Sequence, residues 1–153
     1  MITVLLKRLT PEGINVKGEE PPDILDIEKD EYIKCPNNIY YDLNVALVNN
    51  GVLVKGSVKT ILLCKCCNCL NDYKYCLENK DICHYYETPT KDKIDLTDDI
   101  REDILLSFPL NLKCSENCKG LCLKCGQNLN INSCLCKDDK QENSWNELDE
   151  LKF

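Results

Sequence analysis

Clustered cysteines constrain this chain more than any other feature. There are 13 in 153 residues, and ten of them fall within two short stretches, 64–69 and 114–136. Their number is odd, and the apolar run at the start, Ile2 to Leu6, is shorter than the roughly 7–15 apolar residues of a secretory signal. We therefore expect a thiol-reducing compartment, where clustered cysteines usually bind metal. No window approaches the roughly 18 apolar residues of a membrane span, so we expect no membrane association.

The second cluster has the spacing of a metal site. Within it, Cys122-x2-Cys125 is followed by Gly126, which is typical of a knuckle that holds an ion in a tight turn. Zn²⁺ prefers four such ligands in a tetrahedron, and a further close pair can complete the set. The alternatives are a disulfide network and unliganded thiols. The sequence predicts about one Zn²⁺ per chain, and the candidate ligands are Cys122, Cys125, Cys134 and Cys136, with Cys114 and Cys118 as replacements or as part of a second site.

The first cluster contains a weaker candidate pair, Cys66 and Cys69. Its C-x-x-C spacing fits half of a second zinc site, a redox dithiol, or an inert pair in a buried turn. A thioredoxin-like dithiol requires a parallel βαβ setting, whereas this pair follows a predicted antiparallel hairpin. A second zinc site would need two more thiols, for which the candidates are Cys76, Cys83, Cys114 and Cys118.

Periodicity predicts a mainly antiparallel fold. Residues 41–49 alternate in polarity, Asn50-Gly51 is a strong turn signal, and residues 52–63 read as the returning strand, with Gly56 at a bulge or a close backbone approach. Residues 97–107 carry apolar residues at helical spacing behind the caps Asp95 or Thr97. Further predicted strands cover 2–8, 73–77 and the region of Tyr85-Tyr86. Residues 10–38 read as irregular, with a short strand or turn at 24–27. Residues 142–151 read as a short terminal helix.

These patterns together predict a single α+β domain over 1–153. A twisted, mainly antiparallel sheet with one packed helix occupies 40–110, a cysteine-rich module stabilised by zinc occupies 113–136, and an acidic tail occupies 137–153. The module has too few apolar residues for a core of its own, so metal would supply its folding free energy.

The charge distribution limits nucleic-acid binding. The net charge is −7, which opposes sequence-independent binding to a polyanion. Both cysteine clusters nevertheless lie in locally basic stretches, and their lysines either solvate exposed loops or form a basic face. The candidate RNA- or partner-binding residues are Lys55, Lys59, Lys65, Lys113, Lys119 and Lys124, with Lys74 beside the first cluster.

Catalytic signals are weak. His84 is the only histidine and is expected to be solvated. No nucleotide-binding loop, zinc-protease motif or nucleophilic triad is present, and an all-cysteine zinc site has no open coordination position. The carboxylates at 98–103 are expected on the solvent side of the helix. The sequence predicts neither enzymatic activity nor a small-molecule substrate.

The order of motifs resembles a known family. A strand with Val54-Lys55-Gly56-Ser57-Val58 precedes C-x-x-C-L at Cys66 to Leu70, and Ile94-Asp95-Leu96 precedes a helix and proline. The segment from Cys114 to Asn130 then reads C-x3-C-K-G-L-C-x-x-C-G-x-N-L-N, followed by Cys134-x-Cys136. This pattern, from about residue 40 to the end, is similar to the YceD family of large ribosomal RNA subunit accumulation proteins.

The resemblance implies a function in ribosome biogenesis. Members support the processing or accumulation of large-subunit (23S) ribosomal RNA in the bacterial cytoplasm or in plastids, without implied catalysis. The expected partners are that RNA, a ribosomal protein such as a small zinc-ribbon protein of the large subunit, or both. Two family arginines are missing, because Asn68 replaces one and Glu142 to Trp145 replace a D-P-R segment. Asparagine cannot grip a phosphate with two parallel hydrogen bonds as arginine does. The alternatives are a zinc-ribbon interaction module unrelated to ribosomes and, from the enzyme class, a thiol redox protein or metal-dependent nuclease.

Overall fold

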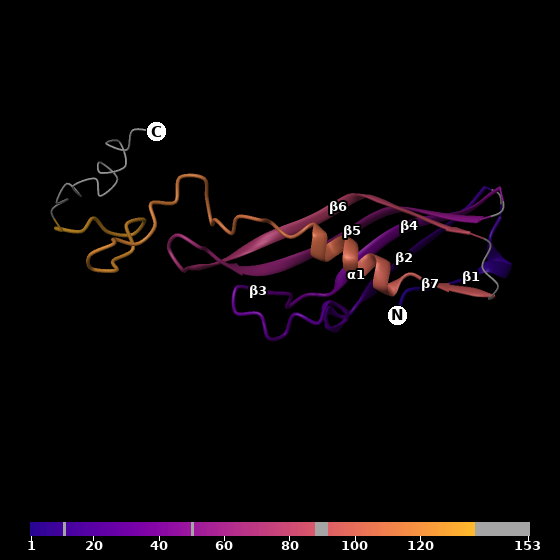
Figure 1. The fold of residues 1–153 in the computed structure, drawn as a ribbon, viewed down its shortest axis with the longest axis horizontal. Helices are drawn as coiled ribbons and strands as arrows, with labels where there is room; N and C mark the ends of the chain where they lie inside the picture. The colour runs from indigo at the N-terminus through magenta and orange to yellow at the C-terminus, as the bar shows by residue number, and fades with distance from the viewer. Residues whose placement is uncertain (11, 50, 88–91, 137–153) are drawn as a thin grey trace, which may run out of the picture.

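The fold is built on a five-stranded antiparallel sheet, shown by the computed structural model in Figure 1. The structure describes residues 1–10, 12–49, 51–87 and 92–136. In the sheet, β4 lies between β2 and β5, and β5 pairs with β6 along its other edge. The strands are β2 (Ile14–Glu20), β3 (Ile33–Lys34), β4 (Ile39–Val48), β5 (Gly51–Lys65) and β6 (Asp72–Glu87).

The predicted hairpin forms, with its turn shifted by one residue. Val48 pairs with Gly51, so Gly51 is the first residue of β5 instead of part of the turn. Asn49 adopts a positive φ of 52°, a conformation that asparagine tolerates better than most residues. The inward positions alternate as expected, with Leu43, Val45 and Val54 fully buried.

Gly56 fulfils both expectations for its position. The register between β5 and β6 shifts between Gly56 and Val58. On the other edge, a Cβ atom at Gly56 would lie 2.2 Å from the backbone oxygen of Asp42. The glycine is therefore needed where β4 and β5 approach closely at the bulge.

One face of the sheet is covered and the other faces solvent. The covering elements are β1 (Thr3–Leu5), β7 (Lys93–Asp95), the 3-10 turns η1 (Leu6–Arg8) and η2 (Pro22–Leu25), and α1 (Thr97–Leu106). β1 and β7 form a separate two-stranded sheet, and α1 lies across the larger one (Figure 1). Ile2, Leu25, Ile100 and Ile104 pack into one core with the inner side chains of β4 and β5. In the described residues, no helix is long and apolar enough to cross a membrane.

The predicted helix is confirmed, and its start is fixed by a side chain. Leu96 is the N-cap residue, and the Asp95 carboxylate accepts hydrogen bonds from the backbone N–H (3.0 Å) and hydroxyl (2.6 Å) of Thr97. These bonds lower the pKa of Asp95. The Thr97 hydroxyl in turn accepts the N–H of Ile2 at 2.9 Å, which connects the helix start to β1.

One prediction of secondary structure was wrong, and two predicted the right strands with the wrong bounds. Residues 10–38 were expected to be irregular, but β2 pairs with β4 along its whole length, because Ile14 and Val16 alternate with polar residues. The segments around 73–77 and 85–86 belong to one strand, β6, which passes through the bulge. The predicted strand over 2–8 ends at Leu5, where η1 begins. The predicted helix at 142–151 and the acidic tail lie outside the described residues.

Candidate metal centre

Two groups of four cysteines bring their sulfur atoms together. Within each group, all four Sγ atoms lie within 4.8 Å of one another. The first quartet consists of Cys66, Cys69, Cys114 and Cys118, and the second quartet consists of Cys122, Cys125, Cys134 and Cys136. All 13 cysteines are free thiols, which disagrees with the disulfide alternative.

The first quartet joins two segments that are far apart in sequence. Cys66 and Cys69 lie in the turn between β5 and β6, where the N–H of Leu70 donates to the oxygen of Cys66 at 2.9 Å. Leu70 has a positive φ of 59°, which completes the tight turn. Cys114 and Cys118 come from the chain after α1, and the Cys66 and Cys118 sulfurs are 3.8 Å apart. Cys66 and Cys69 are buried by this meeting.

Backbone hydrogen bonds hold the same two segments together beside the sulfurs. The N–H of Cys67 donates to the oxygen of Leu112 at 2.7 Å, and the N–H of Leu121 donates to the oxygen of Asn68 at 3.1 Å. Gly120, at a φ of +74°, packs against Asn68, where a Cβ atom would lie 3.1 Å from the Asn68 oxygen. A side chain at Gly120 would therefore both strain the backbone and crowd this junction.

The second quartet closes the segment 121–136 on itself. The N–H of Gly126 donates to the oxygen of Cys122 at 2.9 Å, and the N–H of Cys122 donates to the oxygen of Gln127 at 2.8 Å. These bonds form the knuckle predicted from Cys122-x2-Cys125-Gly126. Gly126 has a φ of +72°, so glycine is favoured there by conformation alone. Cys134 and Cys136 supply the other two sulfurs.

Asn130 connects the two quartets. Its side-chain NH₂ group lies 3.4 Å from the sulfur of Cys118, and its side-chain oxygen accepts the N–H of Lys119 at 2.8 Å. The N–H of Leu129 donates to the oxygen of Gly120 at 2.9 Å, which keeps residues 121–136, called the second module, beside the first quartet. Asn130 therefore orients a first-quartet sulfur from within the second module.

Hydrogen bonds to sulfur favour the thiolate form at selected cysteines. Burial raises the pKa of Cys66, but backbone N–H groups of Cys114, Cys69 and Asn68 outweigh it and bring the pKa to about 6. At Cys122, the backbone N–H groups of Cys125 and Lys124 lower the pKa to about 6. The neighbouring sulfur of Cys118 raises the pKa of Cys114 to about 12. Each quartet thus stabilises some thiolates at neutral pH, and a divalent cation would displace the remaining protons.

The donor sets fit a structural metal ion. Four thiolates that converge from two tight turns are the ligands of closed Cys₄ zinc sites. The sequence offered Cys76, Cys83, Cys114 and Cys118 as candidate partners for Cys66 and Cys69, and the structure brings Cys114 and Cys118 to them. It places Cys76 and Cys83 in β6 instead, exposed and outside both quartets.

The candidate lysines divide into two groups. Lys65 immediately precedes Cys66, and Lys113 and Lys119 are exposed in the cysteine module, so the first quartet brings these stretches together. Lys55 and Lys59 lie on the solvent face of β5, opposite Cys83 and Glu78 of β6. Ten strand residues separate Lys55 from Lys65, which is roughly 33 Å. The expectation of one basic face therefore fails for Lys55 and Lys59.

His84 and two helix carboxylates are not solvated as expected. His84 Nε2 lies 2.6 Å from a carboxylate oxygen of Asp103, and both side chains are less than one-third exposed. The Tyr86 hydroxyl donates to Asp99. These contacts fix α1 on β6, so the structure gives Asp99 and Asp103 a packing function that helical periodicity alone did not reveal.

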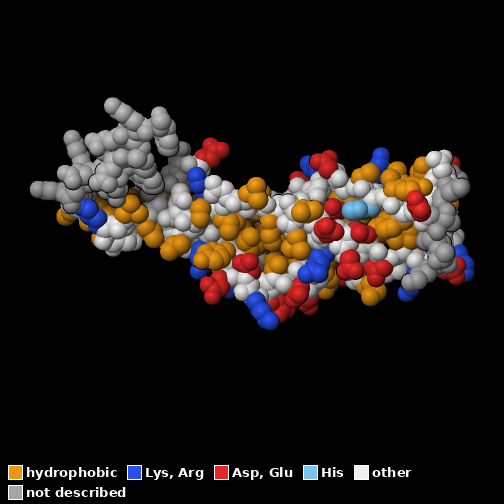
Figure 2. Space-filling view, in the orientation of Figure 1, with side chains coloured by type: hydrophobic (Ala, Val, Ile, Leu, Met, Phe, Trp, Pro, Cys, Tyr) orange, Lys and Arg blue, Asp and Glu red, His pale blue; other side chains and the backbone are white. Residues whose placement is uncertain are grey.

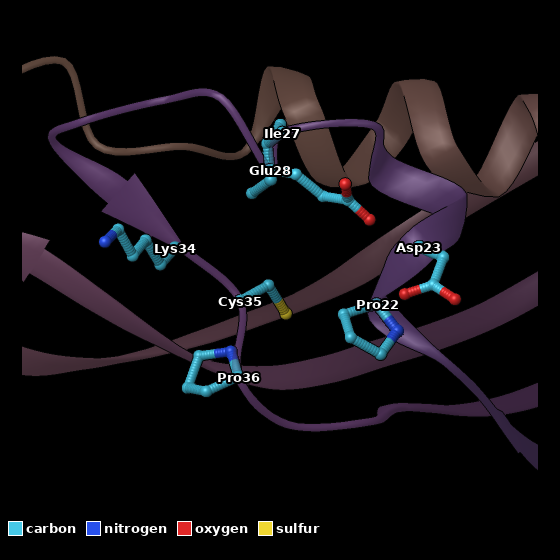
Figure 3. A pocket seen from close by; sticks show the side chains of 7 residues that line it. All are labelled: Pro22, Asp23, Ile27, Glu28, Lys34, Cys35 and Pro36. Carbon is cyan, nitrogen blue, oxygen red and sulfur yellow. The ribbon is translucent and has the colours of Figure 1, made fainter.

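A cavity of about 340 Å³ lies between η2 and β3, and none of its lining residues belongs to either quartet (Figure 3). Figure 3 shows the Cys35 sulfur on the side of Pro22, whereas the Lys34 side chain extends away from the other lining residues. The Cys35 sulfur is already 3.3 Å from the hydroxyl of Thr60. The polar groups that line the cavity do not converge on a common point. The cavity is therefore a weaker candidate for a binding site than the two quartets.

Comparisons with known proteins agree with the motif pattern. The model of the family described as "Large ribosomal RNA subunit accumulation protein YceD" matches residues 78–152. A Zea mays protein, "Large ribosomal RNA subunit accumulation protein YCED homolog 1, chloroplastic", is 53% identical over 51 residues, which cover 32% of this chain and 17% of that protein. The Arabidopsis thaliana protein of the same name is 34% identical over 64 residues, 42% of this chain and 20% of that protein.

The matched regions span a fifth or less of these two relatives. No solved structure matches the chain. The family match includes α1, the two cysteines that follow it in the first quartet, and all four cysteines of the second. Residues 78–152 of the chain, with the two quartets that they help to form, therefore match the YceD family.

Proposed function

We propose that this chain is a non-catalytic factor in the biogenesis of the large ribosomal subunit. In this function it supports the accumulation or processing of 23S ribosomal RNA by binding that RNA, a ribosomal protein, or both. The observation that carries the proposal is the family match over residues 78–152, which includes six of the eight quartet cysteines. The names of the two plant relatives include the same process.

We further propose that each quartet holds one Zn²⁺. Residues 112–136 contribute no residue to the hydrophobic core except the partly buried Leu112. Metal–thiolate bonds would therefore supply the stability that apolar burial does not. The proposal assigns two ions per chain, one more than the sequence alone predicted.

The ligand sets favour a structural function of the metal over a catalytic one. Catalytic zinc keeps a position open for water or substrate, whereas four cysteine ligands fill the tetrahedron. The one histidine of the chain is hydrogen-bonded to Asp103, between β6 and α1.

The proposed partner surface is the pair of cysteine turns, with Lys65, Lys113 and Lys119. A Zn²⁺ with four thiolates has a formal charge of about −2, so these lysines offset the charge of the centres instead of forming a strongly basic surface. Residues 112–136 contain neither arginine nor an aromatic residue, the side chains that most often stack on unpaired bases. This composition favours a composite RNA–protein surface over free RNA. A small zinc-ribbon protein of the large subunit is the candidate protein, in a bacterial cytoplasm or a plastid stroma.

The direct test is cofractionation with large-subunit precursors at low salt. Lys119→Glu with Lys124→Glu should reduce association and leave the zinc content unchanged. The matched control is Lys7→Glu with Lys93→Glu, because these exposed lysines lie near β1 and β7, at the opposite end of the molecule (Figure 1). Association that survives the first pair but is lost when 137–153 are removed would favour a protein partner over direct RNA contact. Absence of the wild-type protein from precursor fractions would favour an interaction module unrelated to ribosomes.

A further inference from the structure

Four lysines lie together at one end of the solvent face of the sheet. Leu62 and Cys64 of β5 are fully buried. Because side chains alternate along a strand, Lys59 and Lys65 lie on the opposite face, toward solvent. Two more lysines complete the group from the neighbouring strands, and the four are called the basic strip: Lys34, Lys59, Lys65 and Lys74.

The strand register places these lysines around one half-buried leucine. Leu63 of β5 pairs with Lys34 of β3 on one side and with Lys74 of β6 on the other. Neighbouring strands lie about 4.8 Å apart, so the Cα atoms of these two lysines are roughly 10 Å from each other. Figure 1 shows β3 and the β5–β6 turn at the end of the sheet toward the cysteine module. Lys59 therefore belongs to a surface of the sheet, although it lies too far from the module to form one basic face with it.

The positive charge of the strip is only partly offset. The ion pairs in the described part of the chain involve none of its four lysines. Two carboxylates lie directly opposite them in the register, Asp72 beside Lys65 and Glu78 beside Lys59. Glu78 already pairs with Lys80 at 3.5 Å. Four lysines against two carboxylates leave a local charge of about +2, in a chain whose net charge is −7.

The two faces of the molecule differ in charge. Figure 2 shows the side that α1 covers, where acidic side chains gather over that helix. The helix has four carboxylates and one arginine in ten residues. A polyanion would therefore be repelled from the helix side and attracted to the basic strip on the open face.

An exposed aromatic ring adjoins the strip. Tyr40 of β4 pairs with Lys59 and is 55% exposed, whereas the preceding residue, Ile39, is fully buried. Between the lysines the surface is aliphatic, because Ile61 is exposed and Leu63 is half-buried. Open antiparallel sheets that present aromatic rings among cations bind RNA by stacking unpaired bases on the rings, while the cations contact phosphates. The sheet thus supplies the aromatic group that residues 112–136 lack.

We propose that this end of the solvent face binds a single-stranded segment of RNA, with a base stacked on Tyr40 and phosphates on the basic strip. An acidic protein would also be attracted by the charge, but it gives no reason for an exposed tyrosine beside the lysines. The bases of a duplex are already stacked on one another and could not reach Tyr40. This inference rests on the proposed function for its ligand, and it adds the sheet to the cysteine turns as a partner surface.

Fluorescence anisotropy with a labelled oligouridylate of about 12 nucleotides tests the inference on the full-length protein as purified. Lys34→Gln with Lys74→Gln should weaken binding at low salt on the order of tenfold. It should also reduce the slope of log K against log salt by about 1.4, or about 0.7 for each lysine, because each lysine–phosphate contact releases a counterion. The matched control is Lys7→Gln with Lys93→Gln, which changes the net charge equally but near β1 and β7, and should leave the slope unchanged.

Tyrosine variants separate stacking from charge. Tyr40→Leu should weaken binding several-fold without changing the salt slope, because stacking on a base releases no counterion. Tyr85→Leu is the control. Tyr85 is 53% exposed, but it pairs with Leu53, which lies six residues along β5 from Lys59, or roughly 20 Å away.

Cofractionation with large-subunit precursors, measured on the same variants, separates this inference from the proposed function. A wild-type protein that cofractionates but binds no oligonucleotide would overturn the RNA contact and leave the proposed function standing. Strip variants that bind as tightly as the Lys7 and Lys93 control would also overturn it. Equal competition by polyglutamate would do the same, because an acidic protein would then fit the strip as well as RNA. Binding that depends on the strip, in a protein absent from precursor fractions, would support the RNA contact and contradict the function in ribosome biogenesis.

Discussion

The sulfurs of Cys66 and Cys118 lie 3.8 Å apart although 52 residues separate them in sequence. Cys66 lies in the turn that connects β5 to β6, the two longest strands of the sheet. Cys118 belongs to the cysteine module that follows α1. The first quartet therefore attaches the module to the sheet, whereas the second quartet holds the module together internally. Removing one ion should consequently have a different effect from removing the other.

Cys118→Ser and Cys134→Ser separate these two effects. Each should lower the zinc content by one ion per chain. Cys118→Ser should also speed hydrogen exchange at the N–H groups of Cys67 and Leu121, because these groups donate across the junction that the first quartet closes. Cys134→Ser should leave both protected and expose the amide of Gly126 instead. Mass spectrometry of exchanged peptides measures the difference.

The matched control for both variants is Cys76→Ser. Cys76 is an exposed thiol on β6, outside both quartets, so its replacement should change neither zinc content nor exchange. Equal loss of protection at the junction in the Cys118 and Cys134 variants would show that the two centres form one unit, and would rule out separate functions for the two quartets.

Asn130→Ala should weaken metal binding at the first quartet from a distance. The Asn130 side chain donates to the sulfur of Cys118 and accepts the N–H of Lys119, so it orients a ligand without being one. Loss of such a group typically lowers metal affinity by about 10–100-fold. Competition with a chromophoric chelator measures the change, and Asn132→Ala is the control because its only described hydrogen bond is made by the backbone. Identical chelator curves for wild type and Asn130→Ala would contradict the proposed coupling.

Gly56→Ala should destabilise the sheet by about 1–3 kcal/mol, the usual range for overpacking a close contact. The added Cβ would lie 2.2 Å from the oxygen of Asp42, and backbone cannot yield as a flexible side chain can. Denaturant unfolding measures the loss, with Ser57→Ala as the neighbouring control. A Gly56→Ala protein as stable as wild type would show that β4 and β5 separate more easily than their register suggests.

Tyr86→Phe should make the fold less sensitive to alkaline pH. Burial and the hydrogen bond to Asp99 raise the pKa of Tyr86 above its usual value near 10. Because the folded state holds this proton more tightly, the stabilisation is complete below pH 10 and is lost as the pH rises above it. The unfolding free energy of wild type should therefore fall more steeply above pH 10 than that of Tyr86→Phe. Tyr85→Phe, on the exposed face, should behave as wild type, and parallel curves for all three proteins would contradict this explanation.

Local patterns predicted the parts of the fold that local residues determine. The β4–β5 hairpin follows from alternating polarity, and α1 follows from Ile100 and Ile104 one helical turn apart. The strand β2 was missed because residues 10–38, which include Gly18, read as irregular. Gly18 is instead required by packing, since a Cβ there would lie 2.4 Å from the Tyr41 hydroxyl oxygen of the neighbouring strand. Only the pairing partner explains that glycine.

The candidate metal centre also has one part that local spacing predicts and one part that depends on the fold. Cys122, Cys125, Cys134 and Cys136 are close in sequence, and spacing alone was enough to group them. The first quartet depends on where the β5–β6 turn lies relative to the chain after α1, which no local pattern contains. The contacts of His84 with Asp103 and of Tyr86 with Asp99 were also missed, because they require the helix to be placed on β6.

The number of zinc ions per folded chain tests the central claim most directly. Elemental analysis combined with native mass spectrometry should find two Zn²⁺ in the purified wild-type protein, and one each in Cys66→Ser and Cys122→Ser. Simultaneous circular dichroism would show that the sheet survives in both variants, since its core contains neither residue. A folded wild-type protein that copurifies with no metal, and gains none when zinc is added under reducing conditions, would contradict the claim that the two quartets are metal centres.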